Sequence, residues 1–202
     1  MENLIQAVAD SLFVELEASG RHVHVTKEQS MALFGHLLTP KRPLSQPGQF
    51  LAQERVTVIG PKGEFRDVAV LGPERSEGQV EISLTDARTL GIDAPIRLSG
   101  DIQGTPGAEL AGTRGRVRLL RGVIAAKRHI HLTPRAAERF GVKNGETVKL
   151  KTLTERPVTF EDVSVRVSEK FAPYAHLDYD EANACGFKKG DLGRIIKCSG
   201  RC

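Results

Sequence analysis

The chain has 202 residues, of which 40% are hydrophobic and 5% aromatic, and it contains no tryptophan. This length allows one large domain or two small ones with a buried core, and the shortage of aromatic side chains argues against a base-stacking platform or an aromatic sugar cleft. The net charge of +4 fits an anionic ligand but is too small to indicate nucleic acid, so no nucleic-acid partner is expected.

The cysteines and the hydropathy indicate the compartment. Cys185, Cys198 and Cys202 form no regular framework, so a secreted disulfide scaffold is not expected and the cytoplasm is the expected compartment. No stretch approaches the ~18 consecutive apolar residues of a membrane span. We therefore expect no membrane partner.

In chain order, the first expected element is a short amphipathic helix over residues 1–12, where Leu4, Ile5, Val8 and Leu12 recur at helical spacing. An early acidic residue and the lack of a basic region argue against a signal peptide. One interpretation is a helix that docks on the fold, and the alternative is a partner-binding or encapsulation segment.

The rest of the chain is expected to alternate short strands and short helices. Further helices are expected at residues 26–34, 84–90, 133–140 and 179–185. Runs of β-branched residues, broken by glycine, proline and asparagine, predict strands at residues 55–59, 68–71 and 147–150. The Pro-rich, basic residues 39–48 predict a loop, and the Gly-rich residues 99–116 predict a long hairpin or an interdomain crossing. These short strands indicate small barrels or sandwiches.

The two halves of the chain resemble each other. Residues 21–27 (RHVHVTK) are echoed by residues 128–134 (RHIHLTP), and both are followed by a helical stretch that ends near Phe-Gly. Residues 81–87 (EISLTDA) align without a gap with residues 176–182 (HLDYDEA). Two copies are too few for a solenoid, so we interpret the repeat as an internal duplication. Together with the short strands, it indicates a mainly β protein.

Two His-x-His motifs, His22/His24 and His129/His131, stand at matched places of this repeat. Alternate residues of a strand point to one face, so each pair presents two imidazoles on the same side. Two ring nitrogens can then converge on one ion at about 2.0–2.1 Å. The alternative is a duplicated structural strand whose histidines are satisfied by hydrogen bonds in the core. Five of the six histidines fall in repeated positions, with His36 as the exception, which favours metal binding.

Each half also supplies a third candidate ligand, because Glu81 stands in the repeat where His176 stands. The predicted ligand sets are His22, His24 and Glu81 in one half, and His129, His131 and His176 in the other. Imidazole and carboxylate ligands suit zinc, iron, cobalt or nickel. Three protein ligands leave an open position, as in catalytic rather than structural zinc sites. We therefore predict a two-metal active site.

Arg75 is a candidate for substrate binding, because it lies only six residues before Glu81. An arginine near divalent ions indicates an oxyanion, which its planar fork of donors can hold. The alternative is a solvated surface residue. The sequence contains no Walker A loop, no Rossmann glycine fingerprint and no Gly-x-Ser-x-Gly motif. It also offers no Ser-His or Cys-His nucleophile pair, and Cys185 is not expected to be a nucleophile.

Five short motifs together resemble one known family. They are residues 19–24 (SGRHVH), 44–50 (LSQPGQF), 71–75 (LGPER), 128–132 (RHIHL) and 176–183 (HLDYDEAN). With these motifs, the chain from about Ser11 to Lys197 resembles the PduL-type phosphotransacylases, the phosphate propanoyltransferases. The resemblance implies an acyltransferase that reversibly converts a short-chain acyl-CoA (propanoyl-CoA or acetyl-CoA) and phosphate to an acyl phosphate and CoA. It also implies two zinc ions per chain, held by the two ligand sets.

The resemblance further implies substrate contacts. Arg75 matches the family's phosphate-contacting arginine and is the expected catalytic residue. The expected contacts to coenzyme A are Ala18, Ser19, Gly20, Arg42 and Asn183. Ala69 falls where some relatives carry a basic residue. We expect one metal to serve the CoA sulfur and the other, with Arg75, to serve phosphate, without a covalent intermediate.

The fold that the resemblance implies is a pair of small β-barrels, capped by short helices and related by pseudo-symmetry. The expected domains are residues 19–126, and residues 127–202 together with an N-terminal strand at 9–18. Relatives are commonly homodimers, and many carry an N-terminal tail that targets them into a bacterial microcompartment. The implied partners are therefore a second copy and microcompartment shell or core proteins, in the cytoplasm or in the lumen of such a compartment.

Two other functions could use the same ligands. A zinc metallohydrolase would cleave a thioester or a phosphate ester with water as the nucleophile. A non-catalytic binding module would use zinc only to tie the two barrels together, and would leave no open coordination position.

Overall fold

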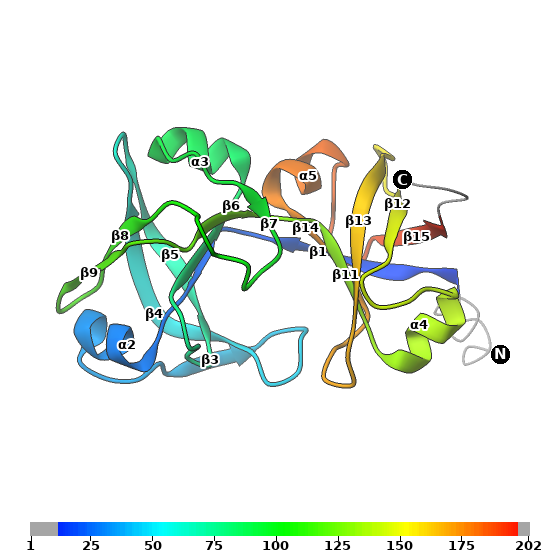
Figure 1. Cartoon of the computed structure of the whole chain (residues 1–202). Helices are drawn as coiled ribbons and strands as arrows, with labels where there is room; N and C mark the ends of the chain where they lie inside the picture. Colours follow the sequence, from blue (N-terminus) through cyan, green and yellow to red (C-terminus); the bar gives the residue numbers. More distant parts are fainter. Residues whose placement is uncertain (1–11, 198–202) are drawn as a thin grey trace. The chain divides into compact units, whose positions relative to one another are not determined.

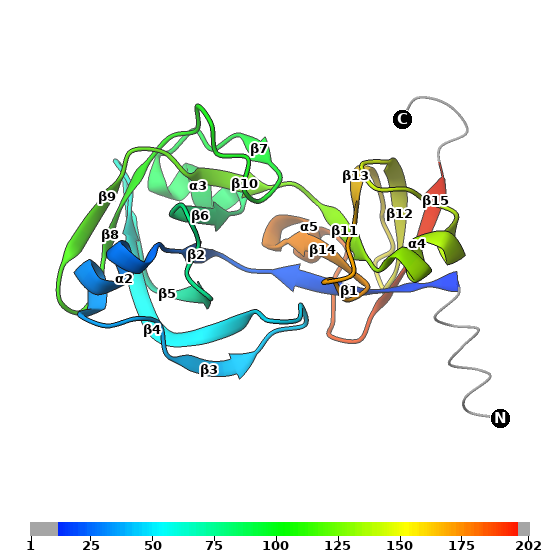
Figure 2. The same cartoon turned by 60° about the horizontal axis from the view of Figure 1, so that its bottom comes forward.

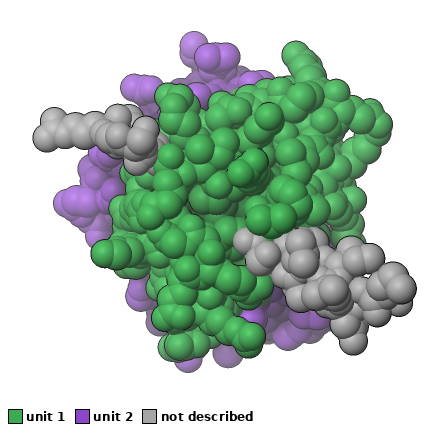
Figure 3. All heavy atoms as spheres, turned by 90° about the vertical axis from the view of Figure 1, so that its right-hand side faces the viewer, with its two compact units in different colours: residues 1–19, 127–202 green, residues 20–126 purple. Residues whose placement is uncertain are grey.

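The computed structural model describes residues 12–197 and divides the chain into two compact units (Figure 1). Unit 1 combines the described residues up to Ser19 with those from Lys127 onward, and unit 2 runs from Gly20 to Ala126; Figure 3 colours the two units separately. The helix expected over residues 1–12 lies, apart from Leu12, outside the described residues, as do Cys198 and Cys202.

Unit 1 is a closed barrel of six strands in the order β1-β14-β11-β13-β12-β15. The strands are Val14–Ser19 (β1), His129–Leu132 (β11), Thr147–Leu153 (β12), Thr159–Val167 (β13), Tyr174–Asp178 (β14) and Leu192–Lys197 (β15). Buried residues alternate along β12, as expected for a strand with one face on the core. Leu16, Ile130, Leu150 and Leu177 are fully buried in this core, and closure of the barrel leaves no free sheet edge.

Unit 2 is a nine-stranded sheet in the order β7-β10-β6-β2-β5-β4-β8-β9, with β3 paired to β4 at its side (Figure 2). The strands are His22–His24 (β2), Pro40–Pro43 (β3), Phe50–Ile59 (β4), Glu64–Gly72 (β5), Gln79–Ile82 (β6), Ile96–Arg97 (β7), Ala108–Ala111 (β8), Arg116–Leu119 (β9) and Val123–Ala126 (β10). Its hydrogen-bonded path has two ends, so unit 2 is a half-barrel, whereas unit 1 is a closed barrel. The prediction of a mainly β fold is confirmed.

The internal duplication is visible in the strand order. The path β1-β14-β11-β13-β12-β15 of unit 1 corresponds strand by strand to β10-β6-β2-β5-β4-β8 of unit 2, and the successive pairs are parallel, antiparallel, parallel, antiparallel and antiparallel in both. β1 precedes β2 in sequence but belongs to unit 1, and β10 precedes β11 but belongs to unit 2. Each unit therefore contains the strand that leads, along the chain, into the other unit's histidine strand.

The four helices of the described residues form where the sequence predicts them, with ends that differ by no more than one residue. They are Lys27–Phe34 (α2), Leu84–Leu90 (α3), Pro134–Phe140 (α4) and Tyr179–Ala184 (α5). Their N-caps are Thr26, Ser83, Thr133 and Asp178, whose side chains accept a backbone N–H from the first turn. None of these helices is long and apolar enough to cross a membrane.

The prediction of a loop at residues 39–48 is wrong in part, because Pro40–Pro43 forms strand β3, which pairs antiparallel with β4. All four of its residues are exposed. Proline cannot donate to a sheet ladder but is tolerated at an edge, so the proline content did not exclude a strand there. Within residues 99–116, β8 begins a hairpin that continues into β9 inside unit 2, so the interdomain crossing is not found there.

Candidate metal centres

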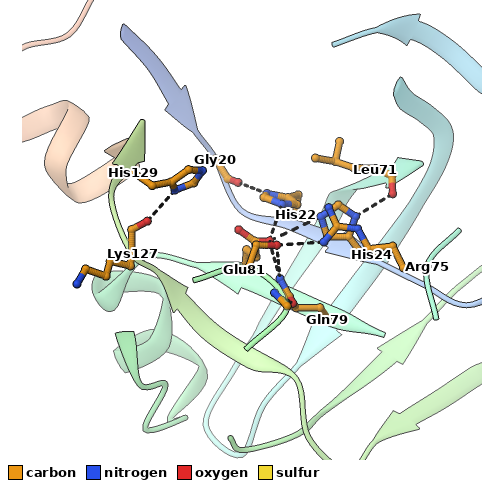
Figure 4. Close-up of polar contacts among 11 residues, drawn as sticks. Gly20, His22, His24, Leu71, Arg75, Gln79, Glu81, Lys127 and His129 are labelled. Atoms are coloured by element: carbon orange, nitrogen blue, oxygen red, sulfur yellow. Dashed lines mark hydrogen bonds and ion pairs between the residues drawn. The ribbon is translucent and has the colours of Figure 1, made fainter. Parts of the chain in front are cut away.

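His22, His24 and Glu81 come together in unit 2 (Figure 4). β2 pairs antiparallel with β6, and His22 stands directly opposite Glu81. Strand alternation brings His24 to the same face, while Val23 between them is fully buried in the core. The Nε2 atoms of His22 and His24 lie 3.6 and 3.7 Å from Glu81 Oε1. All three side chains are buried, so the cluster is shielded from water.

The Nδ1 atoms of both histidines face backbone carbonyl oxygens (Figure 4). Nδ1 of His22 lies 2.8 Å from the oxygen of Gly20, and Nδ1 of His24 lies 3.1 Å from that of Leu71. A carbonyl oxygen only accepts, so each Nδ1 carries the hydrogen and donates it. In the neutral rings the Nε2 atoms then hold the lone pairs toward Glu81, and this is the arrangement that ligating histidines use.

The electrostatics of this cluster favour a bound cation. Burial lowers the pKa of His22, but the charge and hydrogen bond of Glu81 outweigh burial, and the pKa is raised. Burial, with the charges of His22 and Arg75, holds the pKa of His24 well below its usual value. Burial raises the pKa of Glu81, yet its interactions with His22 and His24 outweigh burial and hold that pKa well below its usual value. The carboxylate therefore stays ionised, and a divalent cation would take the place of the proton on His22.

Two further side chains hold the Glu81 carboxylate, and the sequence interpretation missed both. Ser99 Oγ donates a hydrogen bond to Glu81 Oε1 at 2.6 Å, and Gln79 Nε2 donates to the same oxygen. Gln79 stands two residues before Glu81 on β6, so strand alternation could have identified it. Ser99 lies in a turn after β7, and no local pattern points to it.

Arg75 is tied to the same network. Its Nη1 donates to Ser99 Oγ at 3.0 Å, and its backbone N–H donates to the carbonyl oxygen of Val25 at 2.9 Å. The side chain is half-buried, and its charge lowers the pKa of both His22 and His24. The Arg75 guanidinium therefore lies beside a cluster that is expected to hold a cation. An anion bound here would reduce the repulsion between these two positive charges.

His129, His131 and His176 come together in unit 1. β11 pairs antiparallel with β14, and His129 stands directly opposite His176. The ring centres lie 4.7 Å apart for His129 and His131, 4.9 Å for His129 and His176, and 4.8 Å for His131 and His176. Nδ1 of His129 donates to the carbonyl oxygen of Lys127 at 2.8 Å, which repeats the arrangement of the first histidine of unit 2. Phe171 stacks on His131, with 4.0 Å between ring centres.

These two clusters fit metal ions. Among residues 12–197, the groups of three side chains whose ligand atoms lie within 4.8 Å of one another are the two predicted ligand sets. Three imidazoles, or two imidazoles and a carboxylate, are donor sets that zinc accepts. Hydrogen bonds already orient His22, His24, Glu81 and His129. The residues present therefore fit the zinc ions that the family resemblance implies.

The residues expected to contact coenzyme A fall in both units. In unit 1, Ala18 and Ser19 end β1, and Asn183 lies exposed on α5, which contacts β1. In unit 2, Gly20 supplies the carbonyl oxygen described above, and Arg42 is exposed on β3. The contacts of these five residues with coenzyme A stay predictions.

An arginine precedes each histidine pair and holds the helix that follows the third ligand. In unit 2, Nη2 and Nε of Arg21 donate to the two carboxylate oxygens of Asp86 at 2.7 and 3.1 Å. The guanidinium also lies 4.1 Å from the ring centre of Phe65. In unit 1, Nη1 of Arg128 donates to Glu181 at 2.7 Å. Asp86 and Glu181 each complete the capping box of their helix. The arginine–carboxylate contact therefore links the start of each helix to the strand that carries the histidines.

Replacing Arg21 with alanine is expected to destabilise the protein by about 2 kcal/mol. The substitution leaves the Asp86 carboxylate, whose side chain is 6% exposed, without its bidentate partner. Urea unfolding measures the loss. Arg66→Ala is the matched control, because Arg66 is 83% exposed in its ion pair with Glu64 and should cost less than about 1 kcal/mol. Equal losses in the two variants would contradict the anchoring role.

Comparison with known proteins gives one consistent result. A family model described as phosphate propanoyltransferase matches residues 15–188. A protein of Clostridioides difficile named phosphate propanoyltransferase is 52% identical over 199 residues, which cover 98% of this chain and 95% of that protein. Proteins of the same name from Enterococcus faecalis and Thermotoga maritima are 55% identical over 185 residues (91% of this chain and 88% of the relative) and 50% identical over 182 residues (89% and 87%).

Proposed function

Because the chain belongs to the phosphate propanoyltransferase family and is therefore a phosphate acyltransferase, we propose that it reversibly transfers the acyl group of propanoyl-CoA or acetyl-CoA to inorganic phosphate with the help of two bound zinc ions. A phosphate oxygen attacks the thioester carbonyl carbon, the carbon–sulfur bond breaks, and the thiolate leaves and takes up a proton. The products are the acyl phosphate and free CoA. The observation that carries the proposal is the three-ligand cluster that each unit builds from matched strands, fully buried in unit 2 and largely buried in unit 1.

Zinc, when bound, would act as a Lewis acid that stabilises an oxyanion and accepts a thiolate sulfur. In unit 2, His22 and His24 offer Nε2 lone pairs, because their Nδ1 hydrogens are donated to backbone carbonyl oxygens. Glu81 offers a carboxylate whose low pKa keeps it ionised. Hydrogen bonds from Ser99 and Gln79 fix the orientation of that carboxylate, so the ligands need little rearrangement to bind an ion.

We assign the phosphate to unit 2 because Arg75 stands there. Its guanidinium is held by Ser99, and a planar fork of donors suits the oxygens of a phosphate. Fixing the phosphate in place removes part of the entropic cost of bringing it to the thioester. The same positive charge would stabilise negative charge that develops during attack.

We assign the CoA sulfur to the zinc ligands of unit 1. Thiolate sulfur is a preferred ligand of zinc, and three of the five expected CoA contacts, Ala18, Ser19 and Asn183, belong to this unit. The basic excess of the chain would attract coenzyme A, which is a multiply charged anion.

A covalent acyl-enzyme is not part of the proposal. Cys185 is the described cysteine, and its side chain is fully buried and donates to the carbonyl oxygen of Ala182. Burial raises the pKa of this thiol, which disfavours the thiolate that a nucleophile requires. Direct attack by phosphate is therefore the simpler route.

A coupled assay with metal analysis tests the proposal. CoA release from propanoyl-CoA and acetyl-CoA, followed with a thiol reagent, is expected to require phosphate. The same sample is expected to contain about two zinc ions per chain, since each cluster offers the three protein ligands of a catalytic zinc site. Removal of zinc with a chelator should abolish the activity, and added zinc should restore it.

The rival functions predict other outcomes of this assay. Thioester or phosphate-ester cleavage that needs no phosphate would favour a zinc metallohydrolase. Two tightly held zinc ions with no turnover of any acyl-CoA would favour a non-catalytic binding module. The ligand clusters alone suit all three functions, and membership of the phosphate propanoyltransferase family favours acyl transfer among them.

The wider partners stay predictions from the family resemblance. They are a second copy of the chain in a homodimer, and the shell or core proteins of a bacterial microcompartment. The expected location is the cytoplasm or the lumen of such a compartment. The N-terminal segment on which targeting would depend lies outside the described residues.

A further inference from the structure

Glu17 lies beside the third ligand of unit 1. β1 pairs in parallel with β14, and Glu17 stands directly opposite His176. Oε2 of Glu17 is 3.2 Å from Nδ1 of His176. The Glu17 side chain is 36% exposed and that of His176 is 11% exposed, so the carboxylate contacts the ring from the outer side. Nε2 of His176 is buried and remains as the nitrogen for the cluster with His129 and His131.

The matching place in unit 2 holds no carboxylate. β10 stands in unit 2 where β1 stands in unit 1, and there Ile124 is opposite Glu81. Ile124 is fully buried. In unit 2 the third ligand is itself a carboxylate, and its outer neighbour is apolar. In unit 1 the third ligand is an imidazole, and the carboxylate stands behind it. Each unit therefore supplies one carboxylate at its cluster. In unit 2 the carboxylate of Glu81 is itself a candidate ligand, and in unit 1 the carboxylate of Glu17 contacts the candidate ligand His176.

We propose that Glu17 is a positioning residue of the unit 1 zinc site, which accepts the Nδ1 hydrogen of His176 while Nε2 of that ring binds the ion. The inference rests on the proposed function, because it requires zinc in this cluster. A carboxylate behind a ligating histidine selects the tautomer, orients the ring and raises its basicity. A charged acceptor does this more strongly than the backbone carbonyl oxygen that serves His129.

If the Glu17–His176 ion pair served only to stabilise the fold, loss of the Glu17 charge would change the free energy of unfolding and leave both zinc affinities unchanged. The Glu17 side chain is about one-third exposed, and exposed ion pairs contribute little to folding stability. Loss of the Glu17 charge is therefore expected to leave the urea unfolding midpoint of the metal-free chain near that of the metal-free wild type. The effect should instead fall on one of the two zinc affinities.

Zinc titration of the metal-free chain against a chromophoric chelator tests the proposal. Glu17→Ala removes the acceptor, and Glu17→Gln keeps the shape but removes the charge. We expect one of two zinc ions to bind about 10- to 100-fold more weakly in Glu17→Ala, less weakly in Glu17→Gln, and the other ion to bind as in the wild type. Glu15→Gln is the matched control, because Glu15 lies on the same strand opposite Tyr174 and should change neither affinity.

The cobalt-substituted protein gives a second readout that does not depend on activity. Its visible absorption should change at one site in both Glu17 variants and stay unchanged in Glu15→Gln. Folded Glu17 variants with wild-type zinc affinities and an unchanged cobalt spectrum would overturn the inference but leave the proposed function in place. Equal weakening of both ions would also overturn it, because Glu17 then acts through the fold. A wild-type chain that binds no zinc would overturn the proposed function and this inference together.

Discussion

Replacing His129 with alanine is expected to lower the zinc content from about two ions per chain to about one, and to reduce phosphate-dependent CoA release by at least about 1,000-fold. His129 is a full member of the unit 1 cluster, since its ring centre lies within 4.9 Å of both other histidine ring centres. Two imidazoles alone hold zinc poorly. A Lewis acid is worth several kcal/mol to a reaction, and each 1.36 kcal/mol corresponds to a factor of ten.

Zinc analysis and the CoA-release assay on one sample check this prediction. His36→Ala is the matched control, because His36 is the one histidine of the six that belongs to neither cluster, and it is exposed. It should keep both zinc ions and full activity. His24→Ala should lose the other ion. If His129→Ala keeps two zinc ions and releases CoA at the wild-type rate, the ligand assignment is wrong.

Replacing Arg75 with alanine is expected to raise the KM for phosphate or lower kcat, by about 10- to 100-fold, while both zinc ions remain bound. The guanidinium is held by Ser99, but it is no member of either ligand cluster. In the proposed role, its loss removes the charge-assisted hydrogen bonds expected to phosphate, which contribute about 1.5–3 kcal/mol each. Steady-state kinetics with phosphate as the varied substrate separate the two effects.

Two further variants sharpen the Arg75 experiment. Arg75→Lys keeps the charge but loses the planar fork, so it should recover only part of the activity. Arg88→Ala removes an exposed arginine of the same unit on α3 and should leave both kinetic constants unchanged. Zinc loss in Arg75→Ala would show that Arg75 maintains the cluster instead of binding phosphate, and unchanged kinetics would contradict its role altogether.

The elements whose cause is local were predictable from the sequence. The helix starts follow from capping residues such as Thr26 and Ser83, which accept backbone N–H groups within the first turn. The shared face of His22 and His24 follows from the two-residue period of a strand. The third members of the two clusters came from aligning the repeat, because duplicated segments occupy matched strands. For this reason Glu81 and His176 stand in the same register opposite the first histidine of each pair.

The tertiary structure alone decided which distant segments pair. No local periodicity shows that β1 and β10 stand in matched places of the two units, and only this pairing brings Glu17 to His176. Ser99 reaches Glu81 because the turn after β7 folds back on β6. Strand β3 forms because β8 pairs only with the second half of β4 and leaves one side of the first half open for β3. Local residue patterns encode periodicity and caps, whereas contacts between distant segments depend on strand register and chain path, which are set by the packing of the whole unit.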